Sequence, residues 1–282
     1  MIRREDATAP AILLPDDAPP GPVLAHCDAR RTHRLVRHLG TRAEMLGGHV
    51  AILRTLGRSR PTWVPTFNYD FCSSGTYDTR RSESQVGPIT ETFRVAAADW
   101  RSSVPVFNFA GTGTMFAGGR PRAELVDPFG ADSGFGALAT SDGVVLWYGT
   151  PISSTTLIHY VERCSGGPLY RYDKLFEGVV HAEDDSFPTT LRYHVRPWGR
   201  QLDYDWSRLE RDLIDEGIHR RLEGAPAIAW ASVRSLCEYW VNRLSGDPLY
   251  LLDGASRSWV EPELQRLGRR FVITDFESDN HE

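Results

Sequence analysis

Apolar and polar positions alternate along this chain in short runs of two kinds. The clearest run covers residues 143–149, a β-branched and aromatic segment between two glycines, which is typical of a strand buried on both faces. Shorter apolar runs at 21–26, 62–67 and 105–110 predict further strands. Apolar residues at helical spacing predict helices from about residue 31 and at 43–56, 88–95 and 133–140.

The alternation of strand, loop and helix predicts an α/β fold with a central mixed sheet flanked by helices. Residues 68–84 are expected to form a long polar and aromatic loop. After about residue 185 the pattern changes, and it predicts a strand at 191–195 followed by helices at 204–217 and 229–244. Because no linker precedes this region, we expect a single domain over 1–282. Its core would span about 20–185, with a C-terminal α+β lobe, about 186–282, packed on the same core.

The segment after the clearest strand carries a pair of titratable residues. Serines 153–154 and two threonines open it, and apolar residues follow at helical spacing, so we expect a helix that begins near those serines. On such a helix His159 and Glu162 are neighbours at i and i+3, with Thr155 and Thr156 one turn back. An imidazole beside a carboxylate that can orient it is the minimum requirement for a general base. The alternative interpretation is an ordinary surface pair.

Polar residues also follow other predicted strands. In open α/β sheets, ligands bind at the loops beyond the strand ends. We therefore expect a pocket where three loops meet: His26-Cys27-Asp28, Asn68-Tyr69-Asp70 and residues 151–156.

Composition narrows the class of protein and its partners. No apolar run approaches the roughly 18 residues that a membrane helix needs, and residues 1–6 lack the apolar core of a signal peptide, so we expect a cytoplasmic protein. The net charge of −5 gives no reason to expect nucleic acid or an anionic membrane as a partner. The four cysteines form no CxxC pair and the nine histidines no recognisable ligand spacing, so we expect free thiols and no metal.

Several segments resemble, in order and rough spacing, those of the aminoglycoside 3-N-acetyltransferase family. TTLIHYVE and PLYRYDKLF, at 155–162 and 168–176, resemble the segment after that family's central strand. VPTFNYDF, at 64–71, looks like the family's strand-ending PTF motif in the form that its polysaccharide-associated members use. Three further segments fall in the family's order: GPITETFR, RSSVPVFNFA and DPFG, beginning at residues 87, 101 and 127.

The resemblance implies an acyltransferase domain that transfers an acetyl or similar acyl group from an acyl-CoA to the amine of an amino sugar, without a metal. The histidine of TTLIHYVE is the one assigned to base catalysis in the family, and here it is His159. Glu162 would orient and tune it, while Thr155 and Thr156, with the N-terminus of their helix, would stabilise the oxyanion. The protein is expected to bind a small amino sugar and could form a homo-oligomer.

Ligand-binding residues are implied by the same resemblance. The family binds coenzyme A partly through the early strand loop, which here is His26, Cys27 and Asp28. Arg171 is a candidate for the phosphates of coenzyme A, although an exposed helix face would explain it equally well. The substrate contacts are expected at Asn68, Tyr69 and Asp70.

Two positions depart from the family pattern and bear on the acceptor. The early strand usually ends in His-Ser-Ser or His-Ser-Asp, and many aminoglycoside-modifying members carry a histidine where Val104 stands. We therefore favour a singly aminated, nucleotide-linked or otherwise activated sugar, because Asp28, Asp70 and Glu162 offer few carboxylates for a polycation. The alternatives are a drug-resistance aminoglycoside 3-N-acetyltransferase and a catalytically silent relative that binds a sugar or a partner protein.

Overall fold

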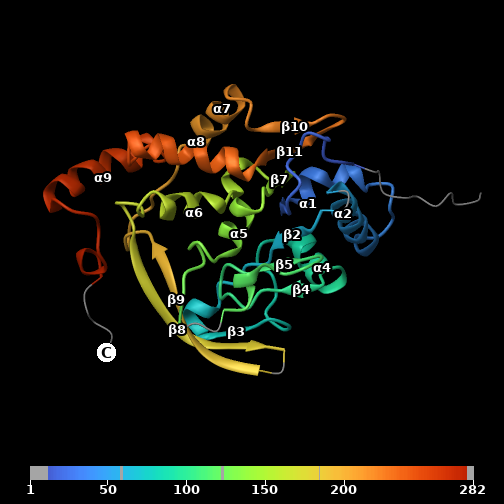
Figure 1. Ribbon diagram of the computed structural model, residues 1–282, viewed down its shortest axis with the longest axis horizontal. Helices are drawn as coiled ribbons and strands as arrows, with labels where there is room; N and C mark the ends of the chain where they lie inside the picture. Colours follow the sequence, from blue (N-terminus) through green and yellow to red (C-terminus); the bar gives the residue numbers. More distant parts are fainter. Residues whose placement is uncertain (1–11, 58–59, 122–123, 184, 278–282) are drawn as a thin grey trace, which may run out of the picture.

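A seven-stranded mixed sheet crosses the middle of the molecule (Figure 1). The computed structural model describes residues 12–57, 60–121, 124–183 and 185–277. Strand order is β10-β11-β7-β1-β2-β5-β4, with β7, β1 and β2 parallel and the strands outside them antiparallel. The three parallel strands are β7 (Val144–Tyr148), β1 (Val23–Cys27) and β2 (Thr62–Pro65).

Helices cover both faces of this sheet, so the predicted α/β fold with flanking helices is confirmed. Side chains of β7 alternate between the faces: Val144 and Leu146 pack in one apolar cluster, Val145 and Trp147 in the other. The first face is covered by α2 (Arg42–Leu56) and α4 (Pro88–Ala96). The second is covered by α5 (Gly134–Thr140), α6 (Leu157–Cys164) and α8 (Val233–Gly246). The candidate base therefore lies on a helix packed directly against the central strands.

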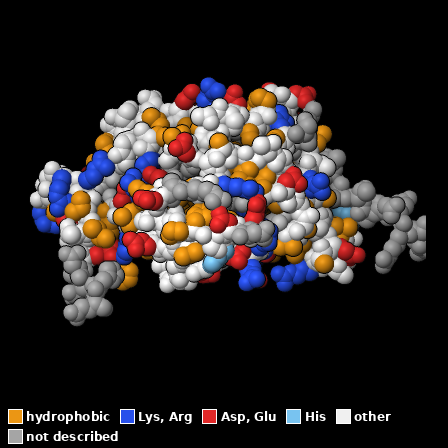
Figure 2. Space-filling view, turned by 60° about the horizontal axis from the view of Figure 1, so that its bottom comes forward, with side chains coloured by type: hydrophobic (Ala, Val, Ile, Leu, Met, Phe, Trp, Pro, Cys, Tyr) orange, Lys and Arg blue, Asp and Glu red, His pale blue; other side chains and the backbone are white. Residues whose placement is uncertain are grey.

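A second sheet is built on a long hairpin that curves below the first (Figure 1). Its strands β8 (Tyr172–Ala182) and β9 (Asp185–Val195) are flanked by β3 (Thr76–Asp78) and β6 (Leu125–Val126). The predicted strand at 191–195 is only the end of β9. The predicted loop at 68–84 is also corrected, because it contains α3 (Phe71–Ser74) and β3. Figure 2 views the side on which the hairpin lies and shows apolar, acidic and basic side chains interspersed.

Local signals explain where several elements begin and end. Helix α2 begins after Thr41, whose side chain exchanges reciprocal hydrogen bonds with Glu44, and it ends at Gly57 as predicted. The helix expected from about residue 31 is only α1 (Ala29–Thr32) followed by the 3₁₀ turn η1 (His33–Leu35). Asp28 accepts a hydrogen bond from the Arg30 amide and so caps α1.

The predicted strand at 105–110 is shorter than expected. The ladder strand β5 covers only Phe109–Gly111 and pairs with β2 and with β4 (Trp100–Arg101). Val106 has a φ of +61°, which a β-branched residue rarely adopts, so the chain cannot continue as regular strand there. Val106 nevertheless pairs with Asn68 in an isolated antiparallel bridge.

The C-terminal region adds strands to the central sheet. β10 (Arg220–Leu222) and β11 (Ala225–Ser232) continue the sheet beside β7. The predicted helix at 229–244 is therefore wrong in its first turn, since Ser232 caps α8 through the Ser235 amide. Helix α7 (Trp206–Asp215) was predicted, whereas α9 (Gly254–Leu267) was not. The division into a core and a C-terminal lobe remains a prediction.

Membrane insertion of a helix can be examined directly. Within the described ranges, none of the helices combines the length and apolar character needed to cross a membrane. The N-terminal residues 1–6, on which the cytoplasmic expectation rested, lie outside the described residues.

Candidate active site

The segment after β7 differs from the expected helix at its start. A 3₁₀ turn, η3 (Ile152–Ser154), comes first, and α6 begins only at Leu157, with Thr156 as N-cap residue. The buried hydroxyl of Thr155 donates to the Ile152 carbonyl and accepts a hydrogen bond of 2.8 Å from Trp147 Nε1. The hydroxyl proton of Thr155 is thus used inside the fold, which does not fit the expected role as an oxyanion donor. Thr156 is half-buried at the start of α6.

His159 and Glu162 meet on one side of α6, as predicted from their spacing. His159 Nδ1 lies 2.8 Å from Glu162 Oε2. The Glu162 side chain is 1% exposed and the His159 side chain 19% exposed, so this is not an ordinary surface pair. The ring of His159 packs against Phe129, with ring centroids 5.2 Å apart. The imidazole therefore lies between a buried carboxylate and the protein surface.

Four further side chains surround the carboxylate of Glu162. The phenols of Tyr170 and Tyr204 donate hydrogen bonds of 2.7 Å and 2.6 Å to Oε1. Arg171 Nε lies 3.9 Å from Oε1, and His194 Nε2 lies 3.4 Å from Oε2. We call Glu162 with these residues and His159 the Glu162 array. A carboxylate with this many donors is held both in charge and in orientation.

Burial and neighbouring charges determine the protonation of the array. Burial favours the neutral form of Glu162, but Arg171 and the two histidines outweigh it and hold the pKa of Glu162 well below its usual value. Burial lowers the pKa of His159 to about 4, although Glu162 opposes this shift. Because an ionised carboxylate can only accept, the neutral imidazole carries its proton on Nδ1. His159 Nε2 is then the basic nitrogen, ready to accept a proton at neutral pH.

The same cluster contains potential metal ligands. Ligand atoms of His159, Glu162 and His194 lie within 4.8 Å of one another. However, Glu162 Oε2 already accepts from His159, Oε1 accepts from two phenols, and the guanidinium of Arg171 lies beside them. A second cation there would be repelled by Arg171 and would have to displace these donors. The donor set therefore suits a hydrogen-bonded carboxylate better than a metal site.

Arg171 lies in a different place from that expected of a residue that binds phosphates of coenzyme A. It belongs to no exposed helix face; it immediately precedes β8, and its side chain is 5% exposed. It donates to the Tyr204 phenol at 3.0 Å and provides the positive charge beside Glu162. Arg171 is thus used to stabilise the buried carboxylate.

The loop after β1 meets the loop after β7, as the pocket prediction required. The Thr150 hydroxyl donates to the His26 carbonyl at 3.3 Å. The His26 ring is buried, and burial lowers its pKa to about 4. Burial also raises the pKa of Cys27, whose thiol contacts the Ala25 carbonyl. Asp28 is occupied in capping α1, so the backbone of this loop is its most available surface.

The loop after β2 contributes one exposed ring. Asn68 is buried and donates to the Glu83 carbonyl at 3.0 Å, so it fastens the loop. Asp70 accepts from Gln85 Nε2 at 2.8 Å. Tyr69 is 44% exposed, and its ring lies 6.3 Å from that of Phe107. Phe107 contacts Phe129 at 4.6 Å, and Phe129 contacts His159, so a continuous row of aromatic rings joins Tyr69 to the base.

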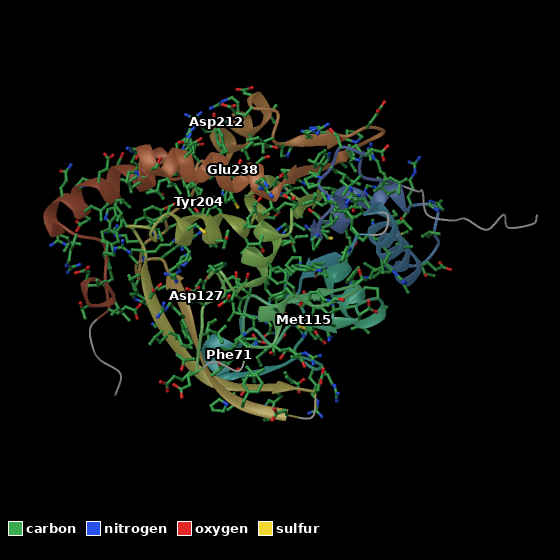
Figure 3. All side chains as sticks on the ribbon, viewed as in Figure 1. Phe71, Met115, Asp127, Tyr204, Asp212 and Glu238 are labelled. Carbon is green, nitrogen blue, oxygen red and sulfur yellow. The ribbon has the colours of Figure 1, made fainter. Side chains whose placement is uncertain are left out.

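Three members of the array were not predicted as site residues. Tyr170 was interpreted as a core residue, and His194 and Tyr204 drew attention only as parts of a strand and a helix. Tyr204 comes from the segment before α7 and lies beside α6 (Figure 3). In the sequence, the signal for these residues is weak, because their common feature is contact with Glu162 across up to 42 residues.

Comparison with known proteins agrees with this geometry. The model of the aminoglycoside 3-N-acetyltransferase family matches residues 57–245. The solved structure of AAC-IIIb with CoASH superposes with a TM-score of 0.64 and 18% identity, covering 81% of this chain and 91% of that one. The apoenzyme of aminoglycoside acetyltransferase AAC(3)-IVa gives 0.60 and 17%, covering 89% and 91%.

A third solved structure extends the comparison. The YokD protein from Bacillus subtilis gives a TM-score of 0.56 and 15% identity, covering 82% of this chain and 90% of that one. At these identities the structures establish a common fold. A search of curated protein sequences finds no match.

Proposed function

Because the chain belongs to the aminoglycoside 3-N-acetyltransferase family and is therefore an N-acyltransferase, we propose that it acylates the amine of an amino sugar, with an acyl-CoA as donor and His159 as general base. The observation that carries this proposal is the 2.8 Å contact between His159 Nδ1 and the buried Glu162 carboxylate. The titles of related structures name CoASH in one case and apramycin or gentamicin in others.

The base acts through its free nitrogen. An amino-sugar ammonium must lose a proton before its nitrogen can attack, and His159 Nε2 accepts that proton. As the imidazole becomes an imidazolium, its Nδ1–H stays bonded to the ionised Glu162, which stabilises the new positive charge. Tyr170, Tyr204 and Arg171 keep Glu162 ionised and fixed in place. Glu162 is in this proposal a positioning residue that acts through His159.

The amine then attacks the thioester carbonyl of the acyl-CoA. A C–N bond forms, the C–S bond breaks, and coenzyme A leaves as a thiol after protonation. The negative charge on the tetrahedral oxygen needs donors, and the first backbone amides of α6, at Thr156 and Leu157, have no partner within their own helix. Thr156, rather than Thr155, is the threonine that we assign to this role.

The acyl-CoA is assigned to the junction of the loops after β1 and β7. Since Asp28 repels phosphate and the Cys27 thiol stays protonated, the uncharged pantetheine arm suits the backbone at 26–28. No phosphate contact is assigned to Arg171, because its side chain is committed to the Glu162 array.

The acceptor is assigned to the side of the row of rings that begins at Tyr69. We propose a singly aminated sugar, nucleotide-linked or otherwise activated, as the preferred acceptor. Glu162 is neutralised by Arg171, Asp70 is bonded to Gln85, and Asp127 pairs with Arg163 at 3.1 Å. These carboxylates leave little free negative charge for a polycation.

A polycationic aminoglycoside is the second candidate, favoured by the family itself. Competition kinetics with a nucleotide-linked amino sugar and a 2-deoxystreptamine drug separate the two, with thiol release as the readout. A higher kcat/KM for the drug, falling steeply as salt is added, would select the second candidate.

The proposal is tested first by isothermal titration with acetyl-CoA. Saturable binding, followed by thiol release in the presence of an amino sugar, is expected. A protein that binds sugars but neither binds acetyl-CoA nor releases thiol with any amine would instead be a catalytically silent relative.

A further inference from the structure

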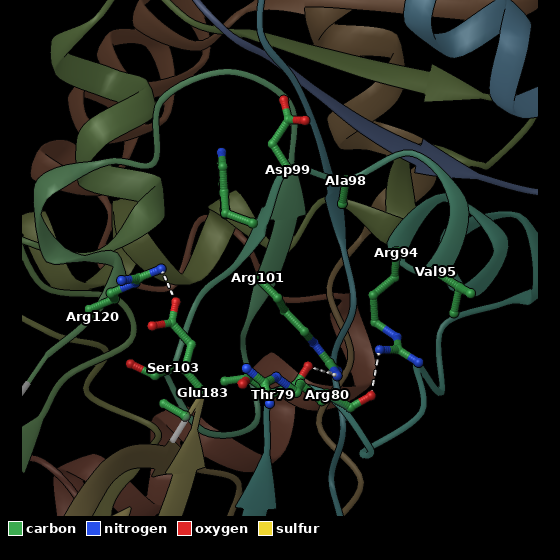
Figure 4. Close-up of a pocket in the computed structure, with 12 residues that line it drawn as sticks. Thr79, Arg80, Arg94, Val95, Ala98, Asp99, Arg101, Ser103, Arg120 and Glu183 are labelled. Carbon is green, nitrogen blue, oxygen red and sulfur yellow. Dashed lines mark hydrogen bonds and ion pairs between the residues drawn. The ribbon is translucent and has the colours of Figure 1, made fainter. Parts of the chain in front are cut away.

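A cavity of about 520 Å³ opens at the edge of the central sheet, beside β4 (Figure 4). Its walls come from the segment after β3, the end of α4, β4 and the tip of the β8–β9 hairpin. None of the residues described as lining it belongs to the Glu162 array. In Figure 1 β4 and the helix α6 that carries His159 lie well apart. The cavity is within the size range of ligand sites, roughly 300–1,000 Å³.

Arg101 is the central cation of this cavity. Its guanidinium donates to neutral acceptors only: the carbonyl and hydroxyl of Thr66, the side-chain carbonyl of Asn108, and the carbonyls of Thr79 and Ser82. In the described part of the chain no carboxylate forms an ion pair with it. Burial lowers the pKa of Arg101. A buried cation is normally paired with an anion, so Arg101 lacks the counter-ion that its environment calls for.

Other polar groups in the wall support an anionic ligand. Arg94 lines the same cavity and is fixed by two hydrogen bonds from Glu91, of 2.6 Å and 2.8 Å. Arg120 pairs with Glu183 across the opening (Figure 4). The Ser103 hydroxyl is buried without a hydrogen-bond partner among the described residues, although most buried polar groups have one.

The negative groups of the wall are placed away from Arg101. Asp99 lies at the opposite end of the cavity from the guanidinium of Arg101 in Figure 4, and its carboxylate accepts from the Gly113 amide at 2.7 Å. Glu183 is neutralised by Arg120. The region around Arg101 and Arg94 is thus the positive end of the cavity.

We propose that this cavity is a second ligand site that binds a small phosphate-bearing molecule, with Arg101 as its principal counter-ion. A guanidinium in a fixed orientation recognises phosphate oxygens through paired N–H groups. The site also adjoins the acceptor loop. Arg101 holds the carbonyls of Thr79 and Ser82, and the neighbouring Glu83 carbonyl holds Asn68. A bound phosphate would therefore strengthen the support of the loop that carries Tyr69.

Val95 allows a test that leaves Arg101 untouched. Its side chain lines the cavity and is 68% exposed, so a longer polar side chain can be accommodated there. Inorganic pyrophosphate is the probe, and its binding to the full-length protein is measured by isothermal titration. We expect Val95→Gln to bind like the parent, and Val95→Glu to bind about tenfold more weakly or worse because its carboxylate repels the probe. Thiol-release activity at saturating substrate should be unchanged in both variants.

Two further arms make the test specific. Arg101→Lys keeps the charge but loses the planar fork, so it should also weaken pyrophosphate binding; thermal denaturation reports whether this variant is folded. Because coenzyme A carries phosphates of its own, the titration is repeated with saturating coenzyme A, and we expect unchanged pyrophosphate binding. Absence of saturable binding, equal binding by Val95→Glu and Val95→Gln, or displacement by coenzyme A would overturn the proposal.

Discussion

The phenol of Tyr204 donates a hydrogen bond of 2.6 Å to Glu162 Oε1, across 42 residues of sequence. The phenol also accepts from Arg171 at 3.0 Å, so it connects the carboxylate to its counter-charge. Tyr204 is itself held by an isolated bridge to Leu252, close to the start of α9. The orientation of the candidate base thus depends on a residue outside the motif that contains the base.

Tyr204→Phe should therefore affect catalysis and stability together. The variant loses a hydrogen bond to a charged group, which costs about 1.5–3 kcal/mol of unfolding free energy. It also removes one of the groups that orient Glu162, so we expect kcat to fall while KM for acyl-CoA changes little. Urea denaturation and steady-state kinetics measure the two effects.

Tyr250→Phe is the matched control for that variant. Tyr250 donates to the Asp212 carboxylate at 2.6 Å, a pair of the same chemistry outside the Glu162 array. It should lose stability without the loss in kcat. Equal losses of kcat in the two variants would show that the effect of Tyr204 is only structural.

His159→Ala should lower kcat by about a hundredfold or more, the usual contribution of a positioned base. Coenzyme A affinity should be nearly unchanged, because the ring contacts Glu162, Phe129 and other residues of the site rather than the loop at 26–28. His181→Ala is the control, since His181 lies on the hairpin and bonds only to Ser186 there. Turnover within a few-fold of the parent would remove His159 from the mechanism.

Glu162→Gln should lower kcat less than His159→Ala does. The double variant should be no worse than the histidine variant alone, because residues that act as one unit give non-additive losses. The glutamine variant also leaves Arg171 without its charge partner, so its unfolding free energy should fall. Full additivity in kcat would assign Glu162 a separate role, such as binding the substrate ammonium.

Stability should depend on pH through three buried histidines. Burial lowers the pKa values of His26, His49 and His159 to about 4, whereas in the unfolded chain they are near 6.5. Between these values the unfolded chain binds protons that the folded chain does not, so the unfolding free energy falls as pH falls from about 6.5 to 4. Above pH 6.5 this contribution is constant.

Urea denaturation at several pH values checks this prediction. His49→Gln should reduce the slope of unfolding free energy against pH in this window, since glutamine has no proton to gain. An unchanged slope would mean that His49 titrates alike in the folded and unfolded chains. The acid limb of kcat/KM should likewise have a midpoint below 6.5 if His159 is the base.

Much of the central sheet could be predicted from the sequence, because its strands are fully buried. The apolar run at 143–149 contains β7, and helical spacing at 43–56 locates α2 almost to the residue. The hairpin was largely missed for the opposite reason. Its strand β8 exposes Leu175 and Val179, at 58% and 38%, so its pattern lacks the contrast between inner and outer positions.

The site was predictable only where it is local. The i, i+3 spacing of His159 and Glu162 predicted their contact, which the structure contains. The burial of Glu162 was not predictable, because it depends on Tyr170, Arg171, His194 and Tyr204, which converge through the hairpin and the segment beyond it. The start of α6 was also misplaced, because Trp147 and the η3 turn compete for the Thr155 hydroxyl that would otherwise favour an earlier helix.

The bond between Tyr204 and Glu162 also constrains the order in which the protein matures on the ribosome. When α6 has emerged, its carboxylate still lacks Arg171, His194 and Tyr204, and the last of these is 42 residues from completion. A nascent chain at that stage can hold the helix but not an ionised, dry Glu162. The residue that fixes Tyr204, Leu252, is synthesised later still. Acyl-transfer competence should thus be acquired near the end of synthesis, after the central parallel strands are already in place.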